Sequence, residues 1–215
     1  MNKKIENCIY CGNQTEVTDD HVPPKSFFPK PRPSNLITVP SCFDCNNKFG
    51  KDEEFFLASF MFTDAGTSDA GKSLWKEKLH RMYNKNIGLK RKIAEHLKPV
   101  DVISKGGIFL RKGIGIKPDE KRWITVVEKI IRGLYYFEYK EILPKNIKMM
   151  SQFLRNDCEY EKAFEYLSQL RIGSRNWKDL FEYRYNRVIE QPYASMWMVR
   201  FYKYATFWVI TRENL

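Results

Sequence analysis

Two pairs of cysteines constrain the fold of this chain more than any other feature of its sequence. Cys8 and Cys11 form the first pair, Cys42 and Cys45 form the second, and each pair has the spacing CxxC. Thiolates supplied in pairs by two tight turns are the usual ligands of a closed tetrahedral zinc site. We therefore expect a structural Zn²⁺ that holds together a proline-rich segment with little hydrophobic core of its own.

The cysteine content and the hydrophobic pattern also indicate where the protein works. The chain has 215 residues and five cysteines, and the fifth, Cys158, belongs to neither pair and is expected to be an unreactive thiol. Four paired cysteines favour a metal site in a reducing compartment over a disulfide framework. No apolar run is long enough to span a membrane, and no signal segment follows Met1. We expect a cytoplasmic protein with no membrane partner.

Charge divides the chain into two unequal parts. The formal net charge of the whole protein is +11, yet residues 1–62 sum to −1 and residues 63–215 to +12. A strongly basic protein points to an anionic partner. We predict two domains, a nearly neutral catalytic module at 1–62 and a basic part at 63–215 that holds the substrate or mediates assembly.

The periodicity of apolar residues predicts an α+β protein. In the first part it predicts strands at residues 17–22 and 36–39, an extended proline-rich loop between them at 23–33, and a helix at 46–62. In the second part it predicts a basic helical segment at residues 72–98 closed by Pro99, a hairpin at 102–110 and a helix at 118–137 that starts near Pro118. A short helix at 159–170 and antiparallel strands at 181–210 follow.

Between and just after the cysteine pairs lie residues of a different chemistry. Asp20 and His21 are adjacent, Asn35 follows the proline-rich loop, and Asn46 and Asn47 come directly after the last cysteine. Carboxylate and amide oxygens suit Mg²⁺ or Mn²⁺ better than they suit zinc. A histidine near neutral pKa can act as a general base. A lone histidine is usually structural, but its place between two cysteine pairs favours a functional role for His21.

This pattern resembles the HNH endonucleases, the ββα-metal or His-Me finger nucleases, in the branch whose paired CxxC knuckles bind a structural zinc. The resemblance covers residues 8–54. It implies that His21 is the general base and that Asn35 braces the loop and orients His21. It further implies that Asp20 and Asn46 hold the catalytic Mg²⁺ or Mn²⁺. The family name expects histidine where this chain has Asn46, so the adjacent Asn47 is a second candidate ligand.

The function implied is metal-dependent hydrolysis of phosphodiester bonds in DNA, in phage defence, restriction or a mobile element. One active site cuts one strand, so cleavage of both strands would call for a homodimer or two binding events. Positive charge does not distinguish DNA from RNA. The candidate nucleic-acid-binding residues are Lys48, Lys51, Lys90, Arg91 and Lys92.

Two alternatives remain open at the level of sequence. The first is a non-catalytic zinc ribbon that binds nucleic acid or protein, which needs the cysteines but not Asp20, His21 and Asn46. The second is an RNase or a nuclease toxin built on the same finger. The sequence of residues 100–215 names no function by itself.

Overall fold

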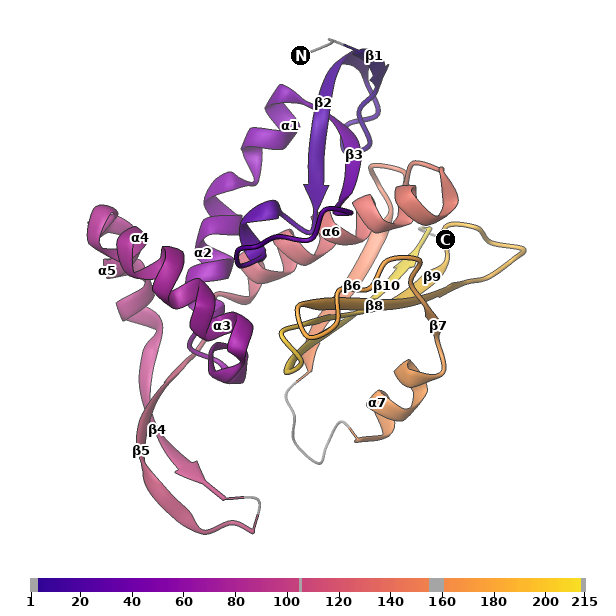
Figure 1. The fold of residues 1–215 in the computed structure, drawn as a ribbon. Coiled ribbons are helices and arrows are strands. Elements are labelled where there is room, and N and C mark those ends of the chain that lie inside the picture. Colours follow the sequence, from indigo (N-terminus) through magenta and orange to yellow (C-terminus); the bar gives the residue numbers. More distant parts are fainter. Residues whose placement is uncertain (1–3, 105, 155–160, 214–215) are drawn as a thin grey trace.

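The fold combines three antiparallel sheets with seven α-helices in the part of the chain that the structure, a computed structural model, describes: residues 4–104, 106–154 and 161–213. The sheets have three, two and five strands, and the long helix α6 (Glu120–Tyr139) lies between the three-stranded and the five-stranded sheet (Figure 1). The prediction of an α+β fold is confirmed. Cys158 lies outside the described residues.

The N-terminal part is a hairpin followed by helices. Strands β1 (Lys4–Asn7), β2 (Gln14–Val22) and β3 (Ile37–Cys42) pair in that order, and the two strands predicted at 17–22 and 36–39 are confirmed as β2 and β3. The predicted helix begins earlier than expected, as α1 (Phe43–Lys48), and continues as α2 (Gly50–Phe60). The reason is that Cys42 caps α1: its Sγ accepts a hydrogen bond from the Cys45 amide at 3.5 Å.

The loop between β2 and β3 is not extended throughout, as its prolines had suggested. It contains a 3₁₀ turn, η1 (Lys25–Phe27), and Phe27 and Phe28 are only 2% exposed. The Tyr202 hydroxyl, far along the chain, donates to the Phe27 carbonyl at 2.6 Å. Burial of these two rings turns the loop back onto the core, because an extended loop would leave them in water.

The basic segment forms short helices. These are η2 (Asp64–Thr67), α3 (Asp69–Leu74), the π-helix η3 (Trp75–Leu79), α4 (His80–Lys85) and α5 (Ile87–His96). A break occurs at Asn86, whose side chain caps α5 by accepting from the Leu89 amide at 3.0 Å. Pro99 does not close the helix: α5 already ends at His96, and Pro99 lies inside β4 (Leu97–Ile103), which pairs with β5 (Phe109–Ile116).

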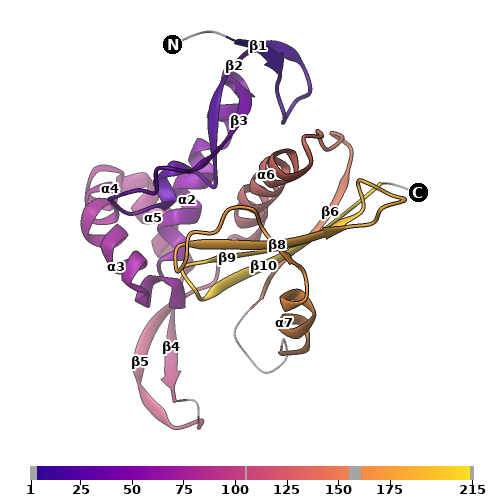
Figure 2. The same ribbon diagram turned by 45° about the vertical axis from the view of Figure 1, so that its right-hand side comes forward.

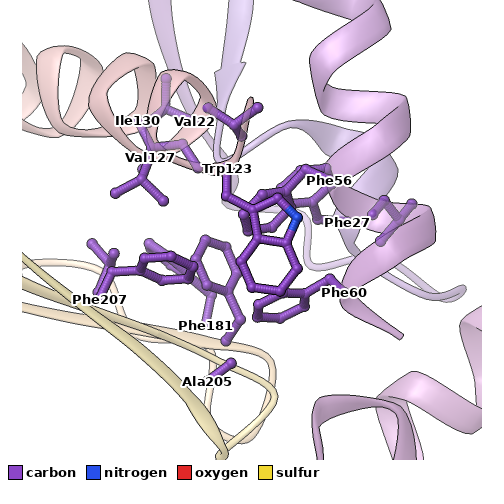
Figure 3. Packing of buried hydrophobic residues seen from close by; sticks show 14 of the residues in the cluster. Val22, Phe27, Phe56, Phe60, Trp123, Val127, Ile130, Phe181, Ala205 and Phe207 are labelled. Carbon is purple, nitrogen blue, oxygen red and sulfur yellow. The ribbon is translucent and has the colours of Figure 1, made fainter. Parts of the chain in front are cut away.

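Helix α6 is the centre of the largest hydrophobic core. Its predicted apolar stripe is confirmed, because Trp123, Val127 and Ile130 are each no more than 1% exposed. Figure 3 shows Trp123 surrounded by aromatic side chains from α2 and from the five-stranded sheet. The Trp123 indole donates to the Ser59 hydroxyl at 2.8 Å. This core draws residues from both sides of the predicted boundary at 62/63, so the two parts share their main source of stability.

The C-terminal part is a five-stranded antiparallel sheet with the order β6-β10-β9-β8-β7 (Figure 2). Its elements are β6 (Lys148–Leu154), α7 (Glu161–Ser168), β7 (Arg171–Ile172), β8 (Phe181–Arg187), β9 (Ser195–Phe201) and β10 (Ala205–Arg212). The strands expected after residue 181 are confirmed, and β6 and β7 were not predicted. Of the short helix predicted at 159–170, residues 159–160 lie outside the described residues. No helix in the described part of the chain is long and apolar enough to cross a bilayer.

Candidate active site

The four cysteines of the two CxxC pairs converge as the sequence predicted. Their Sγ atoms all lie within 4.8 Å of one another, and Cys11 Sγ and Cys42 Sγ are 3.9 Å apart. A tetrahedral zinc with Zn–S bonds of about 2.3 Å requires sulfurs roughly 3.8 Å apart. The donor set and its geometry therefore fit one Zn²⁺, which Cys8, Cys11, Cys42 and Cys45 would hold.

Backbone amide groups near Cys8 favour its thiolate form, which zinc requires. Burial alone would raise the pKa of Cys8, but hydrogen bonds from the backbone at Cys42, Cys11 and Tyr10 lower it to about 7. Burial, followed by the hydrogen bond with Cys42, raises the pKa of Cys45 above its ordinary value. A bound dication would favour the thiolate at all four positions.

The residues at the end of β2 point to two different sides of the sheet. Successive side chains of a strand alternate between its faces. Asp20 pairs in register with Val39, which is 1% exposed, whereas His21 pairs with Thr38, which is exposed. Asp20 therefore lies on the inner face, which packs against α6, and His21 lies on the outer face.

On the inner face, Asp20 belongs to a buried network of charges. Its Oδ2 lies 2.8 Å from Lys129 Nζ and accepts a hydrogen bond from the Tyr10 hydroxyl at 2.8 Å. Lys129 is 2% exposed and also contacts Glu53 Oε1 at 2.5 Å. Burial and the neighbouring Asp20 carboxylate raise the pKa of Tyr10 well above its ordinary value, so its hydroxyl stays protonated and donates. The network joins a zinc knuckle, β2, α2 and α6.

Asp20 retains one oxygen for another ligand. Among the described residues, no buried side-chain nitrogen or oxygen lacks a hydrogen-bond partner. Since the hydrogen bonds and ion pair of Asp20 all involve Oδ2, Oδ1 is the oxygen that solvent can reach. A carboxylate held on one oxygen by neighbouring groups and open on the other is typical of metal ligands.

Asn46 lies toward the same inner face. Its Nδ2 is 3.5 Å from the hydroxyl of Thr18, which precedes Asp20 by two residues and so shares its face of β2. This leaves Asn46 Oδ1 as a second oxygen donor. The amide of Asn47 instead donates to the Phe43 carbonyl of its own helix at 2.8 Å. Asp20 and Asn46 therefore each present an oxygen on this side of the hairpin, and a divalent ion held by both stays a prediction.

On the outer face, His21 lines an open, cationic cleft. The cleft has a volume of about 820 Å³, and Lys25, Lys30 and Arg32 from the β2–β3 loop line it together with Thr38. Burial, followed by the positive charge of Lys25, lowers the pKa of His21 below its ordinary value, against the opposing effect of Asp20 and Asp19. The imidazole is therefore neutral at physiological pH, as a general base requires.

The loop that carries these cations is fixed at several points. Arg32 Nε donates to the Lys25 carbonyl at 3.1 Å, which closes the loop on itself. The Lys30 amide donates to Glu77 of η3 at 3.0 Å, which ties the loop to the basic segment. The cleft therefore keeps its cations near His21 through both local and distant contacts.

Asn35 makes its hydrogen bond far from His21 in the sequence. Its Oδ1 accepts from the indole of Trp177 at 2.8 Å, and Trp177 is 6% exposed. This bond holds the β2–β3 loop against the C-terminal part of the chain. A role for Asn35 in bracing that loop agrees with this contact, whereas its predicted orienting effect on His21 stays a prediction.

The five candidate nucleic-acid-binding residues are exposed and lie on three helices, α1, α2 and α5. Lys48 and Lys51 are at the junction of α1 and α2, and the Lys51 carbonyl accepts from Arg122 of α6 at 2.6 Å. The other three, at 90–92, are on the outer side of α5. The sequence missed the cleft cations Lys25, Lys30 and Arg32, although their density in a proline-rich loop beside His21 is visible there.

Tyr10, Glu53 and Lys129 were also missed. Tyr10 lies inside the first CxxC pair, and a lysine at 129 interrupts the apolar stripe of α6 one turn before Gly133. A Cβ at Gly133 would meet Val22 of β2 at 2.4 Å, so the glycine permits close contact between α6 and the hairpin. In the sequence, the sign of this close contact was a polar residue in the apolar stripe, followed one turn later by a glycine in the middle of the helix.

Comparison of the chain with models of protein families, with curated proteins and with solved structures found no match. The interpretation of the site therefore depends on its residues and their geometry.

Proposed function

We propose that the protein is a zinc-stabilised HNH-type endonuclease that hydrolyses phosphodiester bonds in DNA, with His21 as the general base. The observation that carries this proposal is the position of His21 in a cleft lined by Lys25, Lys30 and Arg32. A neutral imidazole beside three cations is suited to a reaction in which water attacks an anionic phosphodiester. A zinc ion held by the four cysteines would fix the hairpin that carries this histidine.

In this mechanism, His21 takes the proton from the attacking water. The cleft cations Lys25 and Arg32 bind the phosphate and hold it beside His21. Asp20 and Asn46 would bind the divalent ion, Mg²⁺ or Mn²⁺, whose chemistry is to stabilise the leaving oxygen and the developing negative charge. Tyr10 and Lys129 keep Asp20 in place through its Oδ2.

The placement of Asp20 and His21 on opposite faces sets a condition on how the substrate binds. From Thr18 to Val22, β2 pairs with β3, while its pairing with β1 covers residues 14–17. The other edge of β2 is therefore not covered by a strand at Asp20 and His21. In the proposed complex, the phosphodiester reaches across this edge and meets both faces. The scissile phosphate then lies at the end of β2.

The second candidate function is a zinc-dependent module that binds nucleic acid without cutting it. The opposite orientation of Asp20 and His21 favours it, as does the ammonium of Lys129 at 2.8 Å from Asp20, which would repel a nearby dication. This function needs the zinc cluster and the cationic cleft but no catalytic ion. An RNase or toxin using the same site differs from the first proposal only in substrate.

The test is cleavage of supercoiled plasmid DNA with Mg²⁺ or Mn²⁺. His21→Ala should abolish cleavage while zinc content and thermal stability stay at the wild-type values, because His21 is on the outer face. The matched control is His80→Ala, which removes an exposed histidine on α4 and should cut like wild type.

Two other outcomes would decide against the proposal. Equal cleavage by wild type and His21→Ala would mean that His21 is not the base. Binding of DNA without cleavage of plasmid, linear duplex or RNA by the zinc-loaded wild-type protein would favour the binding module. Cleavage of RNA alone would assign the same site to an RNase.

A further inference from the structure

The two-stranded ribbon formed by β4 and β5, described at residues 97–104 and 106–116, extends away from the rest of the protein (Figures 1 and 2). We call it the β4–β5 arm. Its strands pair from Leu97 with Ile116 at the base to Ile103 with Phe109 near the free end. Seven residues of strand correspond to about 23 Å. Both faces of the arm are exposed along most of its length, so the arm contributes little to the hydrophobic core.

Apolar side chains gather at the free end of the arm. Ile103, Ile108, Phe109 and Leu110 are 60%, 68%, 54% and 60% exposed. Isolated exposed apolar residues are common, but several adjacent ones on a projecting element mark a surface that another molecule covers. The free end is therefore an interaction surface.

The charges of the arm select the kind of partner. Lys98, Arg111 and Lys112 are exposed, and Lys112 is neutralised by Asp101 at 2.5 Å. The register places Lys98 opposite Gly115 and Arg111 opposite Val102, so the two other cations among the described residues of the arm are on one face of the ribbon. The same positive charge would repel a second copy of the arm, and it attracts an anionic partner.

Contacts at its base fix the arm to the body of the protein. The Lys117 amide donates to the His96 carbonyl at 2.9 Å, and the His96 ring contacts the Lys117 carbonyl at 3.0 Å. The His96 ring also packs edge-on against Phe55 of α2, with ring centroids 5.7 Å apart. The arm thus continues from α5, which carries three exposed cations at 90–92, and its base is tied to the helix that follows the zinc cluster.

We propose that the β4–β5 arm lies in the major groove of double-stranded DNA, with Lys98 and Arg111 at backbone phosphates and the apolar end against base edges. This proposal depends on the proposed function for its nucleic-acid substrate. The major groove, about 12 Å wide and 8.5 Å deep, admits a two-stranded β-ribbon and displays the apolar thymine methyl groups. Single-stranded DNA is bound mainly by stacking on aromatic rings, and among the described residues of the arm Phe109 alone is aromatic.

The experiment measures the affinity for fluorescently labelled 30-base-pair duplex DNA and for a single strand of the same sequence, over a range of salt concentrations. His21→Ala is the parent protein, so that binding is measured without cleavage. One variant adds Lys98→Gln and Arg111→Gln, and a second adds Phe109→Ser and Leu110→Ser. The matched control adds Lys145→Gln and Lys148→Gln, which removes two exposed lysines near β6.

Both arm variants should bind duplex more weakly, and the control should bind it like the parent within about threefold. The charge variant should lose roughly tenfold to a hundredfold and lower the slope of log K against log salt by up to about 2, because each phosphate contact contributes about 0.9. The apolar variant should lose about tenfold with its salt slope unchanged. Binding of the single strand should change by less than about threefold.

Duplex affinity that is unchanged in both arm variants, or lost equally for duplex and single strand, would overturn the proposal. Dimerisation of the parent that disappears in the apolar variant, with its DNA affinity unchanged, would assign the arm to a second copy instead. A parent that does not bind duplex would also overturn it. Failure of the proposed nuclease activity would give a different result. The wild-type protein, whose arm is intact, would then bind DNA but not cleave it.

Discussion

The two faces of β2 differ in what holds them and in what they can do. On the inner face, Asp20 is fixed by Tyr10 and Lys129 and is 7% exposed. On the outer face, His21 borders an open cleft whose cations come from a single loop. The inner face therefore connects the site to the stability of the whole protein, whereas the outer face can change with little effect on folding. Substitutions on the two faces should separate stability from activity.

Removal of zinc should have the largest effect, because both faces depend on it. A structural zinc contributes apparent binding free energies of about 10–16 kcal/mol in isolated zinc fingers. We expect Cys42→Ser to lose zinc and to lose hydrogen-exchange protection over residues 4–48, while the five-stranded sheet keeps more of its protection through the core that it shares with α2 and α6. Zinc content and hydrogen exchange measured together would check this.

The control for the zinc prediction is Cys158→Ser, which removes the cysteine that belongs to neither pair. It should keep one zinc per chain. Full protection of residues 4–48 in zinc-free Cys42→Ser would show that the hairpin folds without its metal, and the inner and outer faces would then be independent of the cluster.

Substitution of Lys129 should have the next largest effect, and it acts on the inner face. Lys129→Met leaves Asp20 and Glu53 buried without their cation, which costs about 3–5 kcal/mol when one partner of a buried ion pair is removed. For a chain of this length that corresponds to a decrease in Tm of roughly 10 °C. Thermal unfolding of Lys129→Met beside Lys148→Met, an exposed control on β6, would measure it.

A Tm for Lys129→Met within about 2 °C of wild type would contradict a charged inner network. In that case Asp20 and Glu53 would have to share a proton or be hydrated, and the description of the inner face as a fixed, buried site would be wrong.

Local features of the site could be predicted from the sequence, and long-range ones could not. The CxxC spacing predicted the zinc cluster because its ligands are set by two tight turns. The opposite faces of Asp20 and His21 were not predicted, because the resemblance to HNH nucleases implied one shared site, whereas the regular pairing of β2 with β3 separates two adjacent side chains. Lys129 could not be assigned, because nothing in the sequence pairs a lysine in α6 with a carboxylate 109 positions earlier.

The same distinction holds for the fold. The apolar stripe of α6 is a strong helical pattern, and the helix predicted at 118–137 is observed at Glu120–Tyr139. Strand β6 was not predicted, since it is an edge strand whose apolar residues stand in adjacent pairs in the sequence, although their exposure alternates along the strand. Its assignment depends on pairing with β10, some 60 residues later, and local pattern does not contain that information.

Neutralisation of the cleft should weaken the binding of substrate and leave the stability of the protein nearly unchanged. Lys25→Gln with Arg32→Gln removes two exposed cations on the outer face, so we expect KM for DNA to rise about tenfold, as for loss of one or two phosphate contacts. Steady-state cleavage would separate KM from kcat. Lys162→Gln with Lys178→Gln, which removes two exposed lysines elsewhere, should leave both constants unchanged. A change in kcat alone would place these cations in the chemical step instead of in binding.

The smallest expected effect concerns Asn35, whose hydrogen bond with Trp177 crosses from the loop to the C-terminal part. Asn35→Ala and Trp177→Phe each remove that bond, which is worth about 1 kcal/mol, so a double-mutant cycle should give a coupling of that size. Cleavage should fall by only a few fold in each, because the loop is also held by Arg32 and Lys30.

A different result would sharpen the comparison of the two faces. If Asn35→Ala lowered kcat more than a hundredfold while Trp177→Phe left it unchanged, Asn35 would act on His21 directly, as the resemblance to HNH nucleases implies. The bond to Trp177 would then be incidental to catalysis. Equal, small losses in both variants would instead assign Asn35 to the loop, and the orientation of His21 would come from β2 and from the packing of the cleft around it.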